Sequence, residues 1–310
     1  MKAYIYGVDV GGTTIKIGLF DAAGTLLEKR SIETNISHHG AQIIPDLVAA
    51  LNGFDIDPKQ VEGIGVGVPG PVKDGVVFQA VNLGWNNYDV AGALKSLWEH
   101  PVKVTVHNDA NLAALGEQVA GAAQAVNNLV FFTLGTGVGG GIVSDGKIIE
   151  GAHGAAGEIG HMHVGGKGFA CACGNKDCLE TIASASGIKR LAAYYVQETS
   201  LPSRLRQESY YSAKYIFDLA MAGDSIAETI IEDVTDALAQ AAQILAVVAD
   251  PETFVFGGGV SRAGNFLIDK IQEKYKRMAF PTLRDIHFTT ALLGNDAGIY
   301  GAFKSVYDAD

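Results

Sequence analysis

Short apolar runs separated by glycine-rich turns alternate with amphipathic stretches along this chain. A run of about four to eight apolar residues bounded by turn residues predicts a buried strand, whereas apolar positions at helical spacing predict a helix. Strands are therefore predicted at residues 3–10, 15–20, 26–32, 63–68, 102–106, 129–134, 141–143, 253–256 and 286–289. Helices are predicted at residues 42–51, 110–122, 223–250 and 296–307, and Pro251 halts the third of these.

The order of the predicted elements indicates an α/β protein built from two related halves. Three strands, a helix, a strand and a helix come first, and this order begins again at about residue 102. Sheets covered by helices bury their apolar faces in this way, and a cleft between two such halves is a common ligand site. We expect a small lobe over residues 1–116, to which a helix at about 296–310 returns, and a larger lobe over 117–295.

Composition narrows the possible partners. A chain of 310 residues is long enough for two packed domains, and its 39 glycines suit many tight strand-to-helix turns. A formal charge of −11 without a basic cluster argues against nucleic acid as a partner. No apolar stretch of about twenty residues lacks charges, and the N-terminal run does not resemble a secretory signal. We therefore expect a cytoplasmic protein with reduced thiols and no membrane or nucleic-acid partner.

The three cysteines, Cys171, Cys173 and Cys178, lie close together, with His161 upstream of them. Three thiolates and an imidazole make a full tetrahedral set for zinc, and a closed set is typical of a structural site. Buried apolar cysteines or a labile disulfide are the alternatives, but clustered cysteines in a reducing compartment favour a metal. His163 and His153 stay open as the fourth ligand.

Two glycine loops follow predicted strands and suit phosphate binding, because glycine lets backbone N–H groups approach a ligand closely. The first comprises Asp9, Gly11, Gly12, Thr13, Thr14 and Lys16, and the second includes Thr136, Gly137 and Gly139. Asp9 can hold a hydrated Mg²⁺, while Lys16 is either a phosphate ligand or a solvated surface lysine. A third cluster, Gly258 and Gly259, either packs against an adenine or forms a plain turn before a helix.

The predicted strand at 102–106 is followed by an acid-amide pair, Asn108 and Asp109. Either residue can cap the following helix, but a cap needs only one of them. An aspartate opposite a phosphate loop can accept the proton of an attacking hydroxyl, and Asn108 can bind a neighbouring hydroxyl. Glu158 and Glu180, near the cysteines, can each grip sugar hydroxyls with two oxygens.

Taken together, these residues resemble the ROK family of repressors and sugar kinases. The matching motifs occur in order along essentially the whole chain: Asp-Val-Gly-Gly-Thr-Thr-Ile-Lys at 9–16, Gly-Val-Pro-Gly-Pro at 67–71, His-Asn-Asp-Ala-Asn at 107–111, Gly-Thr-Gly-Val-Gly-Gly at 135–140, Gly-Glu-Ile-Gly-His at 157–161, and the cysteine stretch. The resemblance implies an α/β, two-lobed, actin-like and hexokinase-like (ribonuclease H-like) fold. It also implies ATP, Mg²⁺, structural Zn²⁺, a hexose substrate and a homodimer.

By the same resemblance, Asp109 is the catalytic base. The sugar contacts would be Gly70, Asn82, Asn108, Glu158, His161 and Glu180; the zinc ligands would be His161, Cys171, Cys173 and Cys178. Gly12, Thr13, Thr136 and Gly137 would face the phosphates. Asp177 stands where the family has glycine, and we expect the turn to survive because aspartate tolerates positive φ better than most residues.

The resemblance implies an ATP-dependent hexose kinase, most similar to the members that phosphorylate glucose at O6. N-acetylmannosamine, N-acetylglucosamine, allose and fructose stay open as substrates, and polyphosphate stays open as donor. A sugar-responsive transcriptional regulator is the remote alternative. Such a regulator would carry an N-terminal helix-turn-helix domain. We expect that domain to be absent here, because the first glycine loop begins within ten residues of Met1.

Overall fold

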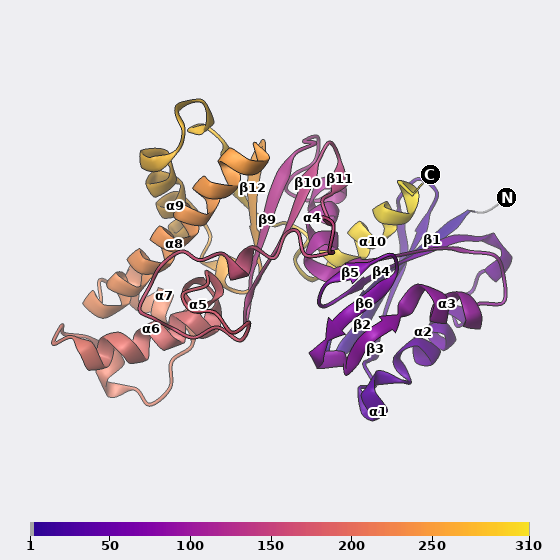
Figure 1. Cartoon of the computed structure of the whole chain (residues 1–310), viewed down its shortest axis with the longest axis horizontal. Coiled ribbons are helices and arrows are strands. Elements are labelled where there is room, and N and C mark those ends of the chain that lie inside the picture. Colours follow the sequence, from indigo (N-terminus) through magenta and orange to yellow (C-terminus); the bar gives the residue numbers. More distant parts are fainter. Residues whose placement is uncertain (1–2, 310) are drawn as a thin grey trace. The chain divides into compact units, whose positions relative to one another are not determined.

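The computed structural model describes residues 3–309 and divides into two compact units (Figure 1). The first unit comprises the chain up to Asn127, Gly141–Gly157 and the chain from Leu293 onward; the second comprises Asn128–Gly140 and Glu158–Leu292. These limits differ from the expected lobes, because residues 117–127 and 141–157 belong to the first unit. The C-terminal helix also belongs to the first unit.

The first unit is built on a five-stranded sheet with the strand order β3-β2-β1-β4-β8. Strand β1 pairs antiparallel with β2 and parallel with β4, and β4 pairs parallel with β8. Buried residues predominate in β1, β2 and β4, as expected for strands with helices on either side, whereas every second residue of β3 is exposed. Their bounds are β1 Tyr4–Val10, β2 Thr14–Asp21, β3 Leu26–Glu33, β4 Val61–Val68 and β8 Lys103–Asn108.

Helices cover both faces of this sheet. Tyr6 and Val8 of β1 lie in one buried cluster with residues of α2 and α3, whereas Ile5 lies in another with Ile299 and Phe303 of α10. This division follows from the alternation of side chains along a strand. The helix bounds are α2 Ile43–Asn52, α3 Val90–Leu97, α4 Asp109–Ala120 and α10 Ala297–Tyr307.

Helix α10 lies unusually close to the sheet and to α4 because glycines face it. A Cβ atom at Gly65 of β4 would overlap the carbonyl oxygen of Ala302, and one at Gly301 would overlap that of Leu112. Side chains would therefore push α10 away from β4 and α4. The C-terminal helix is thus an integral part of the first unit, as its buried Ile299 and Val306 also indicate.

A small sheet, β5-β6-β7, and short helical turns complete the first unit. The small sheet follows β4 and precedes α3 in the chain, and both of its pairings are antiparallel. The bounds are α1 Ser37–Gly40, β5 Val72–Lys73, β6 Val76–Ala80 and β7 Trp85–Asp89, with 3-10 turns at Pro58–Gln60, Val81–Leu83 and Gly294–Asp296.

The second unit carries most of another five-stranded sheet, with the order β11-β10-β9-β12-β13. Strand β12 pairs parallel with both β9 and β13. The strand bounds are β9 Leu129–Leu134, β10 Val138–Ser144, β11 Lys147–Ile148, β12 Thr253–Gly257 and β13 His287–Thr290. The helices are α5 Glu180–Ala183, α6 Ala185–Glu198, α7 Ala213–Met221, α8 Ser225–Ala249 and α9 Asn265–Met278, with 3-10 turns at Ile159–His161, Arg204–Gln207, Val260–Ala263 and Pro281–Leu283.

The two related halves predicted from the sequence are present, but the second begins later than expected. Strand β8, which was expected to open the second half, is the third parallel strand of the first sheet. The second half opens with β9, β10 and β11 instead. The sequence of a single strand does not indicate which sheet the strand joins. For this reason the second half was expected to begin at β8 and begins one strand later, at β9.

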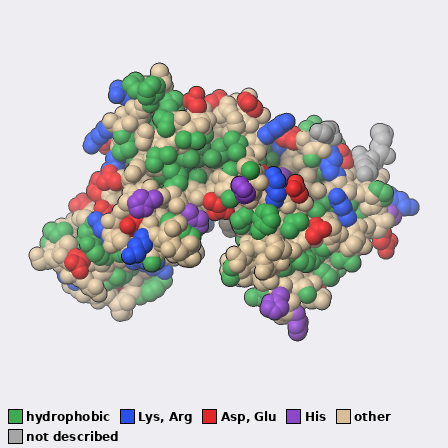
Figure 2. All heavy atoms as spheres, viewed as in Figure 1, with side chains coloured by type: hydrophobic (Ala, Val, Ile, Leu, Met, Phe, Trp, Pro, Cys, Tyr) green, Lys and Arg blue, Asp and Glu red, His purple; other side chains and the backbone are tan. Residues whose placement is uncertain are grey.

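The surface agrees with the acidic composition. Acidic and basic side chains are interspersed on the face drawn in Figure 2. Among the described residues, no helix combines the length and the apolar character needed to cross a membrane.

A buried carboxylate links the end of α4 to the start of the returning C-terminal segment. Glu117 is fully buried, and its Oε1 accepts the N–H of Leu293 at 2.8 Å. Its Oε2 accepts the N–H of Ala122 at 2.8 Å. The carboxylate thus serves two backbone donors that belong to segments far apart in the sequence.

We expect Glu117→Ala to lower the free energy of unfolding by about 3 kcal/mol, because each amide that loses a buried partner costs about 1–3 kcal/mol. Urea unfolding followed by circular dichroism measures this change. Glu99→Ala, at an exposed position, is the matched control and should change stability by less than about 0.5 kcal/mol. Equal stability of the two variants would contradict the role given to Glu117.

Candidate functional site

Three parallel strands of the first unit end at the same edge of its sheet, and the predicted polar residues gather there. In the register of these strands, Asp9 lies opposite Gly67, and Gly67 lies opposite His107. Val68 pairs in turn with Asn108. Carboxyl ends of parallel strands are where α/β proteins place their binding residues. Residues about a hundred positions apart in the chain therefore share one row.

Asn108 and Asp109 stand where β8 becomes α4. Asn108 is the N-cap, and its Oδ1 accepts the N–H groups of Ala110 at 2.9 Å and Asn111 at 3.2 Å. Asp109 is the first helical residue, and its Oδ1 also accepts the Ala110 N–H, at 2.8 Å. The capping role thus falls to Asn108. Asp109 lies half-buried at the positive end of the helix, which favours a carboxylate.

The loop after β4 is tied to the same point. Gly70 has a φ of +90°, and a Cβ there would overlap the carbonyl oxygen of Gln79. Its own carbonyl oxygen accepts the side-chain N–H of Asn108 at 3.2 Å. The amide of Asn108 therefore fixes both the start of α4 and the position of Gly70.

The first glycine loop is a tight turn between β1 and β2. The N–H of Gly11 donates to the carbonyl of Thr14 at 3.0 Å, and Thr34 donates its hydroxyl to Gly11 O at 2.7 Å and its N–H to Thr13 O at 3.1 Å. Thr13 is exposed. A Cβ at Gly12 would lie 3.5 Å from the Cβ of Asn82, so this predicted sugar contact lies beside the loop.

Asp9 and Lys16 face each other across the hairpin that the loop closes. The Lys16 Nζ lies 3.3 Å from Asp9 Oδ2 and donates to the carbonyl of Asn295 at 3.0 Å. Lys16 is therefore a paired, half-buried cation rather than a solvated surface lysine. Burial raises the pKa of Asp9, and the charge of Lys16 opposes this shift. A bound cation would favour the ionised carboxylate further.

The second glycine loop has the same relation to the sheet of the second unit. Thr133 of β9 pairs with Gly257 of β12, so the residues that follow these two strands leave the sheet at one edge. The N–H of Gly135 donates to Gly137 O at 3.0 Å and closes the turn. Gly258 has a φ of +84°, and a Cβ there would overlap the backbone of Leu134. The third glycine cluster therefore packs against the strand that precedes the second loop.

Glu180 connects the second glycine loop with the cysteine-containing segment. Its Oε2 accepts the N–H of Val138 at 3.3 Å, and the same carboxylate leaves no space for a side chain at Gly137. The Cys171 Sγ lies 3.5 Å from Glu180 Oε1. The other predicted acid, Glu158, is exposed and precedes the 3-10 turn that ends at His161. The sugar contacts assigned to both acids stay predictions.

Four predicted metal ligands come together in the second unit. The ligand atoms of His161, Cys171, Cys173 and Cys178 all lie within 4.8 Å of one another. The Cys173 and Cys178 sulfurs are 3.7 Å apart, and Cys171 Sγ is 3.5 Å from His161 Nδ1. Tetrahedral zinc with Zn–S bonds of ~2.3 Å requires sulfurs about 3.8 Å apart. The donor set and its spacing therefore fit a closed tetrahedral site.

The alternatives to this ligand set are not supported. The Nδ1 of His163 lies 3.2 Å from the carbonyl of Lys176, outside the cluster. All three cysteines are free thiols. Asp177 adopts a φ of 56°, and its Oδ1 accepts the N–H groups of Gly168 at 2.8 Å and Phe169 at 3.0 Å. The expectation that the turn tolerates aspartate is confirmed, and the aspartate itself holds the loop.

The three thiols differ in acidity without a metal. Burial raises the pKa of Cys178 to about 12 and also raises that of Cys171. A hydrogen bond from the backbone N–H of Asn175, and to a smaller extent one from the Cys171 side chain, lower the pKa of Cys173 to about 7. Three thiolates together therefore require a cation, and zinc binding would displace the protons.

One hydrogen-bonded pair of side chains at the edge of the first sheet could not be found from the sequence. His107 Nδ1 and Glu150 Oε1 lie 2.5 Å apart, although 43 positions separate the two residues. His107 lies within a predicted motif, but no pattern in the sequence marks Glu150.

Comparison with known proteins connects these features to one family. The profile of the ROK family matches residues 5–309. A glucokinase of Halalkalibacterium halodurans is 41% identical to this chain over 306 residues, which cover 95% of this chain and 92% of that protein.

Solved structures agree. A ROK hexokinase from Thermus thermophilus has a TM-score of 0.82 at 30% identity, with 98% of each chain covered. A ROK family glucokinase from Streptomyces griseus, in complex with glucose and AMPPNP, has a TM-score of 0.75 at 31% identity over 97% of this chain and 98% of that chain. The predicted actin-like, hexokinase-like fold is thereby confirmed.

Proposed function

Because this chain belongs to the ROK family, we propose that it is an ATP-dependent hexose kinase that phosphorylates glucose at O6. The observation that carries this proposal is the row formed by Asp9, Gly70 and the Asn108–Asp109 pair at one edge of the first sheet. The similarity to a glucokinase and to a glucokinase structure with bound glucose and AMPPNP supports glucose as the substrate.

In this proposal, Asp109 accepts the proton of the sugar O6 hydroxyl as that oxygen attacks the γ-phosphorus of ATP. The O6–P bond forms, the bond to ADP breaks, and the hydroxyl proton passes to the Asp109 carboxylate. A positioned base of this kind contributes about 10²–10⁴-fold in rate. The position of Asp109 is set by the Asn108 cap, so the base approaches the substrate in one orientation. Asn108, Glu158, His161 and Glu180 would bind the remaining sugar hydroxyls.

The phosphates of ATP would bind the two glycine loops. Gly12 and Thr13 in the first loop and Thr136 and Gly137 in the second offer backbone and hydroxyl donors, and Gly258 and Gly259 would pack against the adenine. Mg²⁺ would supply charge neutralisation during phosphoryl transfer. Asp9 suits it, because this partly buried carboxylate lies at the end of β1 beside the first glycine loop, with the Lys16 Nζ 3.3 Å from its Oδ2.

We also propose that His161, Cys171, Cys173 and Cys178 hold a structural zinc ion. Four protein ligands at tetrahedral spacing leave no open position for catalysis, so the metal would order the segment that carries Glu180. Cys171 contacts both His161 and Glu180. Glu180 follows the ligand Cys178 by two residues, so ordering of this segment would also hold the carboxylate that meets the second glycine loop.

An assay of ADP release over a panel of hexoses tests the activity. We expect turnover with glucose, and smaller turnover with N-acetylmannosamine, N-acetylglucosamine, allose and fructose, because the polar site is matched to glucose hydroxyls. ATP and polyphosphate are compared as donors in the same assay. Absence of turnover with every hexose would overturn the proposal. Retarded migration of genomic fragments in a gel-shift experiment would then favour the sugar-responsive regulator.

We expect Asp109→Asn to lower kcat by about 10²–10⁴-fold, because the amide retains the shape of the side chain but cannot accept the proton. Glucose binding, measured by calorimetry without ATP, should change little. Asp269→Asn, at an exposed position on α9, is the control and should leave kcat unchanged. An unaltered kcat in Asp109→Asn would remove this residue from the catalytic role.

Elemental analysis of the purified protein should show about one zinc ion per chain. Cys178→Ser and His161→Ala should each reduce that content sharply, because a ligand is lost. His163→Ala is the matched control, since this neighbouring histidine lies outside the cluster, and it should retain the metal. Fully active protein without zinc would contradict the ordering role. The homodimer implied by the family resemblance stays a prediction.

A further inference from the structure

The segment 149–157 forms a closed loop that leads directly to Glu158 in the chain. The N–H of Ala156 donates to the carbonyl of Glu150 at 3.0 Å and closes the loop. Gly154 has a φ of +67° and packs so tightly on the backbone of Val72 in β5 that a Cβ would overlap it. The Nζ of Lys73 lies 3.4 Å from the Gly151 carbonyl. The small sheet therefore supports one side of this loop.

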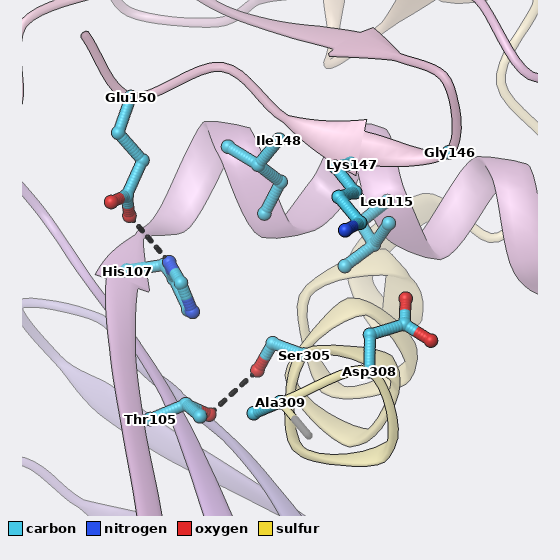
Figure 3. Close-up of a pocket in the computed structure, with 10 residues that line it drawn as sticks. All are labelled: Thr105, His107, Leu115, Gly146, Lys147, Ile148, Glu150, Ser305, Asp308 and Ala309. Carbon is cyan, nitrogen blue, oxygen red and sulfur yellow. Dashed lines mark hydrogen bonds and ion pairs between the residues drawn. The ribbon is translucent and has the colours of Figure 1, made fainter.

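A hydrogen bond between two side chains fastens the other side of the loop to the end of strand β8. Glu150 Oε1 lies 2.5 Å from Nδ1 of His107, the residue that precedes Asn108. Both side chains are only partly exposed, at 30% for Glu150 and 21% for His107. Figure 3 shows them meeting at one end of a pocket, with the second ring nitrogen of His107 pointing away from Glu150. A hydrogen bond between Thr105 and Ser305 at 2.7 Å lies elsewhere in the same pocket.

We propose that His107 and Glu150 are positioning residues for the sugar substrate. His107 directly precedes Asn108, and Glu150 begins the loop that leads to Glu158. The pair therefore joins the two segments that carry Asn108 and Glu158. The inference rests on the proposed function, in which both of these neighbours bind sugar hydroxyls. In this proposal neither His107 nor Glu150 touches the substrate; the pair holds the end of β8 before Asn108 and the loop that leads to Glu158.

The pair can hold the loop against the end of β8 because its hydrogen bond is short and partly buried. Hydrogen bonds in which one partner is ionised are shorter and stronger than neutral ones. Without this contact, the loop keeps the Lys73 contact, its packing on β5 and the backbone bonds from Ile149 to Ile142 and from Ala156 to Glu150, but it loses its side-chain link to β8. Within the described part of the chain, the Glu150 side chain contacts His107, whereas the first glycine loop is held by Thr34 and, through Lys16, by Asn295. Loss of the pair should therefore affect the sugar and spare ATP.

Steady-state kinetics of Glu150→Ala with glucose and ATP varied independently test this. We expect the KM for glucose to rise about 10-fold, because small misplacements of binding groups cost one to two orders of magnitude. The KM for ATP should stay within about twofold. Glu150→Gln keeps an oxygen that accepts the Nδ1–H of His107, and it should restore most of the glucose affinity.

Asp308→Ala is the matched control. Asp308 lines the same pocket, and its carboxylate lies beside Lys304 of α10. The Asp308→Ala variant removes an equal charge from the same pocket but leaves the hydrogen bond between Glu150 and His107 of β8 in place. The KM of this variant for glucose should therefore equal that of the wild-type protein. Equal KM changes for glucose and ATP in Glu150→Ala, or no rescue by Glu150→Gln, would overturn the proposal.

A double-mutant cycle with His107→Gln measures the pair itself. If the residues act through each other, Glu150→Ala should weaken glucose binding no further once His107 is replaced, and strictly additive losses would refute the coupling. Calorimetry of glucose without ATP provides a second readout. Wild-type protein that phosphorylates no hexose would refute the proposed function. Active wild-type protein with Glu150→Ala behaving as Asp308→Ala would refute this inference alone.

Discussion

The parallel pairing of β1, β4 and β8 is the constraint on which the first unit's chemistry depends. Because the three strands run in the same direction and in fixed register, their carboxyl ends bring Asp9, the Gly70 loop and Asn108 to one edge. The cap formed by Asn108 then starts α4 at that edge. A slip of one residue would turn every side chain on β8 to the opposite face of the sheet. The register of the strands therefore determines which residues lie at this edge as well as which residues enter the core.

Close packing behind the sheet holds this edge in place. Helix α10 approaches β4 and α4 through glycines that leave no space for a side chain, and Glu117 ties the end of α4 to the start of the returning segment. In the second unit, the cysteine-containing segment must be held in place by other means. This segment contains few buried apolar side chains besides Cys171, Cys178 and Leu179. Four ligands on one metal would give the segment the order that a short loop cannot obtain from a core of its own.

Much of this arrangement could be predicted from the sequence, and the failures have physical reasons. The strand that carries Asp9 and the helix that begins after Asn108 were predicted, because apolar runs and capping residues act locally. The cysteines and His161 were recognisable as a set through their residue types. The expected lobe of residues 1–116 correctly included residues 103–108, but the second half was expected to begin with this strand and begins one strand later, since strand order depends on contacts between distant segments. Glu150 was missed for the same reason: its partner His107 is 43 positions away.

The residues at the edge of the first sheet serve structure and chemistry through the same hydrogen bonds. Asn108 satisfies two N–H groups of α4 and one carbonyl of the Gly70 loop, so its side chain is held before any ligand arrives. Asp109 inherits that order because it is the next residue on the capped helix. Preorganisation of this kind removes the cost of arranging the catalytic group during the reaction. A structural explanation of Asn108 therefore does not compete with a functional one: the cap also fixes the place of Asp109, the residue proposed as the base.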